Sequence, residues 1–198
     1  MLKRNLFTLG LLSLLSAVAA QAEVTLPKIF GDHMVLQREQ QNPVWGKAAP
    51  GEKVTLTIGE QTKTATADDM GQWMVELDAM KVGKPLTMTV KGKDNTVTFE
   101  DILVGEVWMC SGQSNMRWSV ERTQFGALEV ATANYPEIRL FHMKSVGTQE
   151  PQEDVVGKWE LCSPETVGQF SAVGYFFGRN LYQTLQVPIG LINNAWGG

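Results

Sequence analysis

Residues 103–116 read LVGEVWMCSGQSNM, a largely apolar run that passes directly into a short polar segment. The first seven residues are almost continuously apolar, which is typical of a parallel strand buried on both faces. In open α/β sheets, binding and catalytic groups lie beyond the carboxyl ends of such strands. A serine on a tight, glycine-containing turn there can expose its hydroxyl above the sheet. The segment therefore predicts a functional turn that carries Ser114.

The turn alone does not identify the chemistry. It lacks the second glycine of the G-x-S-x-G nucleophile elbow, and its spacing also fits a polar turn with capping serines. Cys110 lies one residue beyond the predicted strand, but no cation or base is evident nearby to lower its pKa. We therefore exclude this thiol as the nucleophile, and the serine turn remains open between a catalytic and a purely structural role.

The sequence after this turn alternates predicted helices and strands. A helix is expected at about 123–134 and a strand at 138–141. Ser171 is predicted to cap a helix that ends near Leu185, and a third strand covers 188–192. Gly174 and Gly178 lie one turn apart, which would let this helix approach a neighbour closely. Helical crossovers between strands predict a parallel sheet, with 144–163 as a long loop or small subdomain.

The sequence before the turn has a different rhythm. From about residue 23 to 102, apolar and polar residues alternate with period two, as in Val54, Leu56 and Ile58. Glycines punctuate these runs at regular intervals, which is typical of a small antiparallel β-sandwich. We therefore expect a β-sandwich domain at 23–102, followed at 103–198 by the start of an α/β domain.

Residues 1–22 have the pattern of a secretory signal peptide. Lys3 and Arg4 precede an uncharged apolar run from Leu6 to Val18, and small residues stand at Ala20 and Ala22. The apolar run is shorter than the roughly 20 residues that a membrane-spanning helix needs. We expect cleavage before residue 23, a secreted or periplasmic protein, and no membrane attachment after cleavage.

Composition excludes several classes of function. The 198 residues carry 17 Lys+Arg against 21 Asp+Glu, and no basic stripe is present, which argues against a nucleic-acid partner. Two Cys and two His do not form a four-ligand zinc site of familiar spacing. In an oxidising compartment Cys110 and Cys162 can pair, or both can be buried free thiols; the sequence leaves this open.

Several motifs together resemble one family. Residues 105–116 resemble the nucleophile segment of the bacterial sialate O-acetylesterases, which are SGNH hydrolases. The segments DHMVLQR (32–38) and PVWG (43–46) resemble its N-terminal β-region, and 170–178 and 188–198 resemble the approach to its second conserved block. The resemblance covers nearly all of residues 28–198, with the motifs in the same order.

The resemblance implies roles for particular residues. Ser114 matches the nucleophile that attacks an acetyl ester, and its own backbone N–H would be one oxyanion donor. The pair Gly197 and Gly198 matches the block that supplies a second backbone donor. The supporting residues of the turn are Gln113 and Asn115. Arg117 and Trp118 are expected to contact the substrate because they lie just past this turn, and the resemblance does not assign them.

The family's catalytic Asp-x-x-His pair does not occur in this chain. We therefore interpret the chain as the N-terminal part of a longer protein and expect these 198 residues alone to be inactive. His142, which follows the predicted second strand, is a weaker alternative for the general base of Ser114. His33 is weaker still, and a structural role is expected for both.

The predicted function is a carbohydrate acetylesterase that acts on an O-acetylated sugar, with sialic acid as the leading substrate. An acetylxylan-type esterase is the alternative within the same class. A non-catalytic carbohydrate-binding module is the alternative from a different class. The resemblance implies no metal and no organic cofactor. The acetylated position and the oligomeric state are not predicted.

Overall fold

The computed structural model describes residues 23–144 and 146–197. The predicted signal peptide at 1–22 and Gly198 lie outside the described residues. Within the described ranges, no helix is long and apolar enough to cross a membrane.

The strands of the first half follow the alternation seen in the sequence. Val54, Leu56 and Ile58 are buried, whereas the residues between them face outward at least in part, as expected for strands with one face against a core. These strands are β1 (Val35–Gln37), β2 (Asn42–Lys47), β3 (Lys53–Ile58), β4 (Gln61–Thr66), β5 (Gln72–Leu77) and β6 (Leu86–Lys91).

The second half begins within one long strand and then alternates helices and strands. Its elements are β7 (Thr96–Gly112), α1 (Ser114–Arg117), the 3₁₀ helix η1 (Val120–Arg122), α2 (Gly126–Thr132), β8 (Tyr135–His142), β9 (Trp159–Cys162), α3 (Ala172–Leu185) and β10 (Ile189–Ala195). The segment predicted as a loop or small subdomain is a loop that ends in β9.

The described strands do not divide into a sandwich and a separate parallel sheet. Eight of them form one mixed sheet in the order β4-β3-β6-β7-β10-β8-β9, with β1 also paired to β7, while β2 and β5 pair apart. The predicted fold class, a β-sandwich followed by the start of an α/β domain, is therefore wrong. One hydrophobic cluster also joins both halves, since Val54 and Leu77 share it with Phe141 and Ile192. The domain division at residue 102 is a separate matter and stays a prediction.

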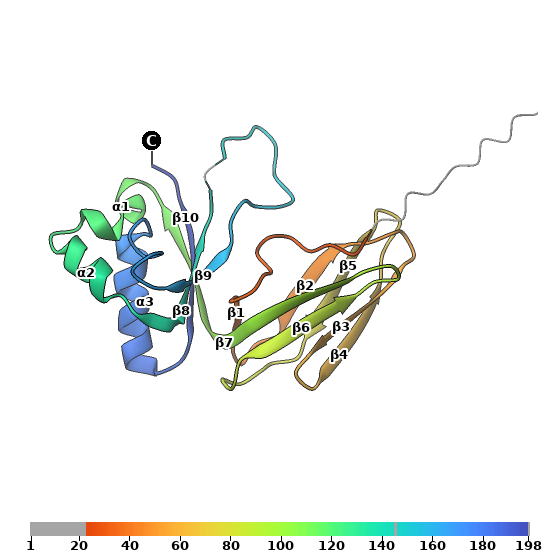
Figure 1. Cartoon of the computed structure of the whole chain (residues 1–198). Coiled ribbons are helices and arrows are strands. Elements are labelled where there is room, and N and C mark those ends of the chain that lie inside the picture. Colours follow the sequence, from red (N-terminus) through yellow and green to blue (C-terminus); the bar gives the residue numbers. More distant parts are fainter. Residues whose placement is uncertain (1–22, 145, 198) are drawn as a thin grey trace, which may run out of the picture.

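Strand β7 connects the two halves (Figure 1). Its first part is antiparallel to β6, its centre is parallel to β1, and its last part, 106–112, is parallel to β10. One extra residue of β7 lies between the pairs Leu86–Ile102 and Met88–Phe99, and Asp101 within this bulge has a φ of +54°. A β-bulge bends its strand. The change of sequence rhythm near 102 therefore marks the start of a segment, 102–105, that is buried on both faces of a continuous strand. The predicted burial does not extend through the whole run, because Trp108 and Met109 are exposed.

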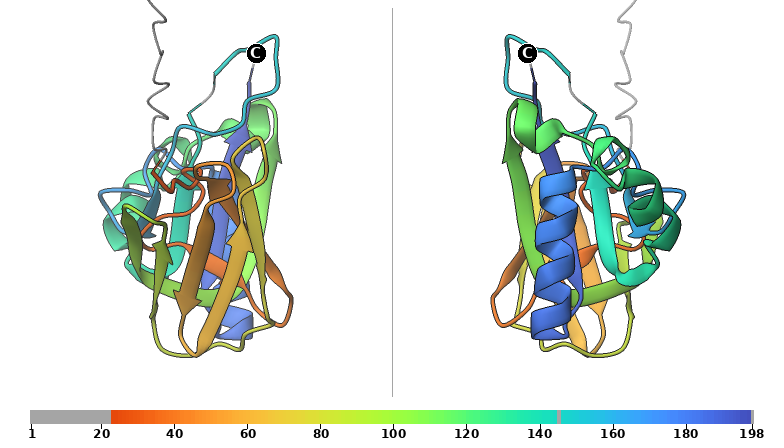
Figure 2. Two further views of the ribbon diagram at one scale, coloured as in Figure 1. Left: turned by 90° about the vertical axis from the view of Figure 1, so that its right-hand side faces the viewer. Right: turned by 90° about the vertical axis from the view of Figure 1, so that its left-hand side faces the viewer.

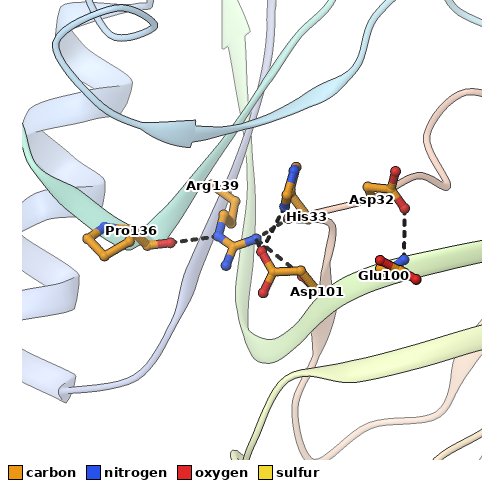
Figure 3. A network of polar contacts seen from close by, with 6 residues as sticks. All are labelled: Asp32, His33, Glu100, Asp101, Pro136 and Arg139. Carbon is orange, nitrogen blue, oxygen red and sulfur yellow. Dashed lines mark hydrogen bonds and ion pairs between the residues drawn. The ribbon is translucent and has the colours of Figure 1, made fainter.

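A polar network fixes this bulge to the neighbouring elements (Figure 3). The Arg139 guanidinium, on β8 and almost fully buried, lies 2.7 Å from Asp101 Oδ2 and donates to the backbone oxygens of His33 and Asp101 at 3.2 Å. Arg139 Nε donates to Pro136 O, and His33 Nδ1 lies 2.7 Å from the same Asp101 oxygen. The network ties the bend of β7 to β8 and to the segment before β1.

Helix α3 covers one face of the parallel strands, as the right-hand view of Figure 2 shows. The predicted cap is confirmed, because Ser171 Oγ accepts a hydrogen bond from Gly174 N at 3.1 Å. The predicted close approach is also confirmed. A Cβ at Gly178 would lie 2.5 Å from Leu191 Cδ1, and one at Gly174 would lie 2.8 Å from Cys110 Sγ. The two glycines allow the helix to sit directly on β10 and β7.

Cys110 and Cys162 are both buried free thiols in this hydrophobic layer. Burial raises the pKa of Cys110 to about 11 and that of Cys162 to about 12. Both thiols are therefore protonated at neutral pH, which agrees with the exclusion of Cys110 as a nucleophile.

Candidate active site

The carboxyl ends of three adjacent parallel strands, β7, β10 and β8, meet at one edge of the sheet. An open cleft of about 830 Å³ lies at this edge. Its described lining comes from the segments that leave these strands and from the turn before α3: Ser114, Arg117, Ser119, Arg122, His142, Met143, Lys144, Gln169, Asn193, Ala195 and Gly197. The cleft is where the topology predicts a site, at the carboxyl ends of parallel strands.

Ser114 enters this cleft from the turn after β7. Gly112, the last residue of the strand, has a φ of +150°, a conformation that side chains disfavour. Gln113 then starts a single helical turn, and its carbonyl oxygen accepts from Arg117 N at 3.0 Å. Asn115 O accepts from Trp118 N. Gln113 and Asn115 thus contribute backbone contacts to the turn that presents Ser114.

The backbone after β10 lies against the same turn. Trp196 N donates to Gly112 O at 2.9 Å, and Arg117 Nη1 donates to Gly197 O at 3.1 Å. A Cβ at Gly197 would lie 3.5 Å from Ser114 Cα and 3.7 Å from Ser114 N. A side chain at Gly197 would thus meet the Ser114 backbone at ordinary van der Waals distance, so the chain after β10 passes close to a residue 83 positions earlier in the sequence. The atom nearest to such a Cβ is Arg117 Cδ, at 3.4 Å, so the Arg117 side chain also borders this space.

The cleft is rich in basic side chains. Arg117, Arg122 and Lys144 line it together with His142, and no carboxylate belongs to its described lining. Among the described residues, no three His, Cys, Asp or Glu side chains are grouped to hold a metal ion. An unneutralised group of cations at an open cleft attracts anionic ligands.

Two buried polar side chains also line the cleft. Asn193, 5% exposed, turns its Oδ1 toward Ala195 N, and Ser119, 6% exposed, has no hydrogen-bond partner for its hydroxyl within the described residues. Neither residue was predicted from the sequence. Asn193 could have been identified from the sequence, because it directly follows the predicted strand 188–192 and the carboxyl ends of parallel strands converge at a site. No sequence pattern marks the other three: Ser119 and Gln169 lie in loops, and Arg122 ends the short 3₁₀ helix η1.

The other predicted residues lie in different places. Arg117 lines the cleft, whereas Trp118 is half exposed beside it and donates its Nε1–H to Arg122 O at 3.1 Å. His142 lines the same cleft as Ser114, and its ring makes an edge contact with Phe170. His33 belongs to the Asp101 network and does not line the cleft.

A serine on a turn after a parallel strand, next to free backbone, is an arrangement found in serine hydrolases. Sequence comparison is consistent with that class. The chain is 37% identical over 187 residues to the sialate O-acetylesterase of Mus musculus and 38% identical over 189 residues to that of Homo sapiens. The chain is thus a homologue of the sialate O-acetylesterases, which confirms the resemblance seen in the motifs.

The matches cover most of this chain but only part of the relatives. They include 84% of this chain and 35% of the mouse protein, and 85% and 36% for the human protein. The chain therefore spans about a third of the length of these relatives. No protein-family model matches the chain.

A solved structure has the same fold. The crystal structure of a carbohydrate acetylesterase from Xanthomonas citri superposes with a TM-score of 0.85 and 38% sequence identity, over 88% of this chain and 41% of that one. The agreement supports the single mixed sheet as the architecture of this part of the molecule.

Proposed function

We propose that the protein is a carbohydrate acetylesterase that uses Ser114 as its nucleophile. The observation that carries the proposal is the close approach of the Gly197 backbone to Ser114, both of which line an open cleft at the carboxyl ends of parallel strands. The homology to sialate O-acetylesterases and to a carbohydrate acetylesterase supports the same chemistry. The protein acts outside the cytoplasm, after cleavage of the signal at 1–22.

The reaction is acyl transfer in two steps. Ser114 Oγ forms a bond to the acetyl carbonyl carbon, and its proton passes to a general base. The backbone N–H of Ser114 and one from the Gly197–Gly198 pair donate to the oxyanion. The bond between the carbonyl carbon and the sugar oxygen then breaks, and that oxygen takes up the proton. Water attacks the acetyl-enzyme, which releases acetate and restores the serine.

The general base follows from the family resemblance. An Asp-x-x-His pair supplies it in the family, and these 198 residues contain no such pair. His142 lines the cleft with Ser114 and is the alternative base. A general base contributes roughly 10²–10⁴-fold to the rate. Substitution of the histidine that acts as the base should therefore lower the rate by that factor, whereas substitution of the other histidine should not.

The charge of the cleft favours an acidic sugar as substrate. Arg117, Arg122 and Lys144 line it without a carboxylate among its described residues. Sialic acids carry a carboxylate, whereas acetylxylan is uncharged along its backbone. Hydrogen bonds to a charged group are stronger than neutral ones. We therefore infer that an O-acetylated sialic acid is the substrate, in preference to acetylxylan.

The nucleophile is tested by Ser114→Ala in a form of the protein that continues past residue 198 through an Asp-x-x-His pair. Acetate release from an O-acetylated sugar should fall by about 10³-fold or more, as expected for loss of a covalent nucleophile. Ser111→Ala is the matched control on the same turn and should stay within about threefold of the wild type. Turnover by Ser114→Ala near the wild-type rate would refute the assignment.

The substrate class is tested by Arg122→Gln in the same form of the protein. We expect kcat/KM for an O-acetylated sialic acid to fall by about tenfold or more, because a charged hydrogen bond is lost. The kcat/KM for p-nitrophenyl acetate, which has no carboxylate, should be nearly unchanged. An equal loss for both substrates would contradict a carboxylate-binding role for the cationic cleft.

A further inference from the structure

A second hollow lies on the β-rich half of the molecule. This groove of about 760 Å³ runs between the N-terminal segment, strands β2 and β5, and the loop before β9. Its described lining is Thr25, Leu26, Pro27, Lys28, Trp45, Gly46, Lys47, Asp68, Gln72, Trp73, Met74, Glu153 and Asp154. It shares no residue with the Ser114 cleft.

An exposed aromatic platform forms one wall of the groove. Trp45 on β2 is 40% exposed, and Met74, directly opposite on β5, is 59% exposed. The Phe30 ring meets the Trp45 indole edge-on at a centroid distance of 4.8 Å. Phe30 is itself buried, so it holds the indole in place from the core side. A large indole that is fixed yet exposed offers a flat apolar face to a ligand.

Polar groups surround this platform. Asp68 Oδ1 accepts from Met70 N and Gln72 N, which fixes the carboxylate at the rim. Gln72 is exposed on the same face of β5 as Met74. Their amide and carboxylate groups provide both donors and acceptors within reach of a ligand on the indole.

The wall is formed by outward-facing side chains of the paired strands. Trp73, which stands between Gln72 and Met74 on β5, points to the opposite face and is buried in the core. The side chains of β2 and β5 that can face a ligand are therefore those of Trp45, Lys47, Gln72 and Met74.

The charge of the groove distinguishes it from the Ser114 cleft. Three carboxylates line it, Asp68, Glu153 and Asp154, against the two cations Lys28 and Lys47. Lys47 is already paired with Glu153, and Asp154 Oδ1 accepts from Lys28 N at 2.8 Å. The groove therefore has no excess of positive charge with which to bind an anion.

We propose that this groove binds a neutral sugar residue, stacked on Trp45, of the glycan that carries the ester. The C–H face of a pyranose ring matches the indole, and its hydroxyls match the carboxylate of Asp68 and the amide of Gln72. The inference does not depend on Ser114, because binding of an unacetylated sugar is measured without any hydrolysis. Failure of the esterase and failure of this site are thus separate outcomes.

The test is calorimetric titration of the purified chain with lacto-N-tetraose and with lacto-N-neotetraose, two neutral galactose-terminated oligosaccharides of the kind to which sialic acids are attached. We expect at least one of the two neutral oligosaccharides to bind. Trp45→Ala should weaken this binding by about tenfold or more, since the stacking surface is lost. Trp108→Ala is the matched control: its indole is 44% exposed but lies on β7 outside the groove. It should leave the affinity unchanged.

Gln72→Ala guards against misfolding as the cause of the loss. Its side chain is exposed, so its thermal unfolding should match the wild type while its affinity falls by about threefold or more. Wild-type chain that binds neither oligosaccharide, or Trp45→Ala that binds as well as wild type, would overturn the proposal. So would a dimer in sedimentation that Trp45→Ala abolishes, because the groove would then be an interface between two copies.

Discussion

Asp101 shows how one residue outside the cleft supports the geometry within it. The residue occupies the left-handed region in the β7 bulge and bonds to Arg139, whose guanidinium is almost fully buried. Burial by itself would raise the pKa of Asp101. The hydrogen bonds and positive charges of Arg139 and His33 outweigh this effect and lower the pKa below its ordinary value of 3.8. The charged carboxylate is therefore the form that the fold favours.

The lowered pKa predicts how stability depends on pH. An acid whose pKa is depressed in the folded state contributes its full stabilisation above the unfolded value and loses it as pH falls through the folded value. The melting temperature of wild type should therefore exceed that of Asp101→Asn at pH 6. The gap should narrow progressively below about pH 4, where the carboxylate of wild type becomes protonated. A gap that is constant from pH 6 to pH 2.5 would contradict this account.

At the scale of single elements, much of the second half could be predicted from the sequence. Ser171 and the apolar face after it fixed the start of α3, and the paired glycines predicted its close packing. The continuity of β7 could not be predicted, because the bulge at Asp101 has no glycine to mark it. The cleft residues after β8 and before α3 were also missed, since their positions depend on the packing of loops rather than on a periodic pattern.

The contact of α3 with β10 gives a prediction at this scale. Gly178→Ala places a methyl group 2.5 Å from Leu191 Cδ1, and Leu191 is fully buried in the central strand. Overpacking costs about 1–3 kcal/mol, which exceeds the roughly 1 kcal/mol that alanine gains over glycine in a helix. We expect a lower free energy of unfolding in urea for Gly178→Ala. Adding Leu191→Val should recover part of the loss; strictly additive effects would show that the two positions do not interact.

At the scale of the whole molecule, the two candidate sites lie on different sheets. The Ser114 cleft lies at the carboxyl ends of β7, β10 and β8, whereas the groove beside Trp45 lies over β2 and β5. The cleft is cationic and the groove is not, as expected if an acidic sugar binds in the cleft while a neutral part of the same glycan binds in the groove. Under the two proposals, the cations of the cleft bind a sugar carboxylate and the mixed polar groups of the groove bind a neutral ring. The two surfaces together favour a glycan with an acidic acetylated residue over an isolated neutral sugar.

The same view of the molecule predicts the behaviour of these 198 residues by themselves. The Gly197 backbone passes close to Ser114, so the proposed nucleophile lies beside the backbone that is proposed to complete the oxyanion site. A serine hydroxyl is nevertheless a weak nucleophile at neutral pH unless a base accepts its proton. The chain contains no Asp-x-x-His pair, and its two histidines are His33, in the bulge network, and His142, in the cleft.

We expect no Ser114-dependent release of acetate by the 198-residue chain. The measurement is acetate release from p-nitrophenyl acetate and from an O-acetylated sialic acid, each compared with the Ser114→Ala version of the same chain. Equal rates for the two versions would agree with a base supplied by the Asp-x-x-His pair. A Ser114-dependent rate that His142→Ala reduces by about 10²-fold or more would contradict this prediction, since a loss of that size is the contribution of a general base. His142 would then be the group that takes the proton from Ser114.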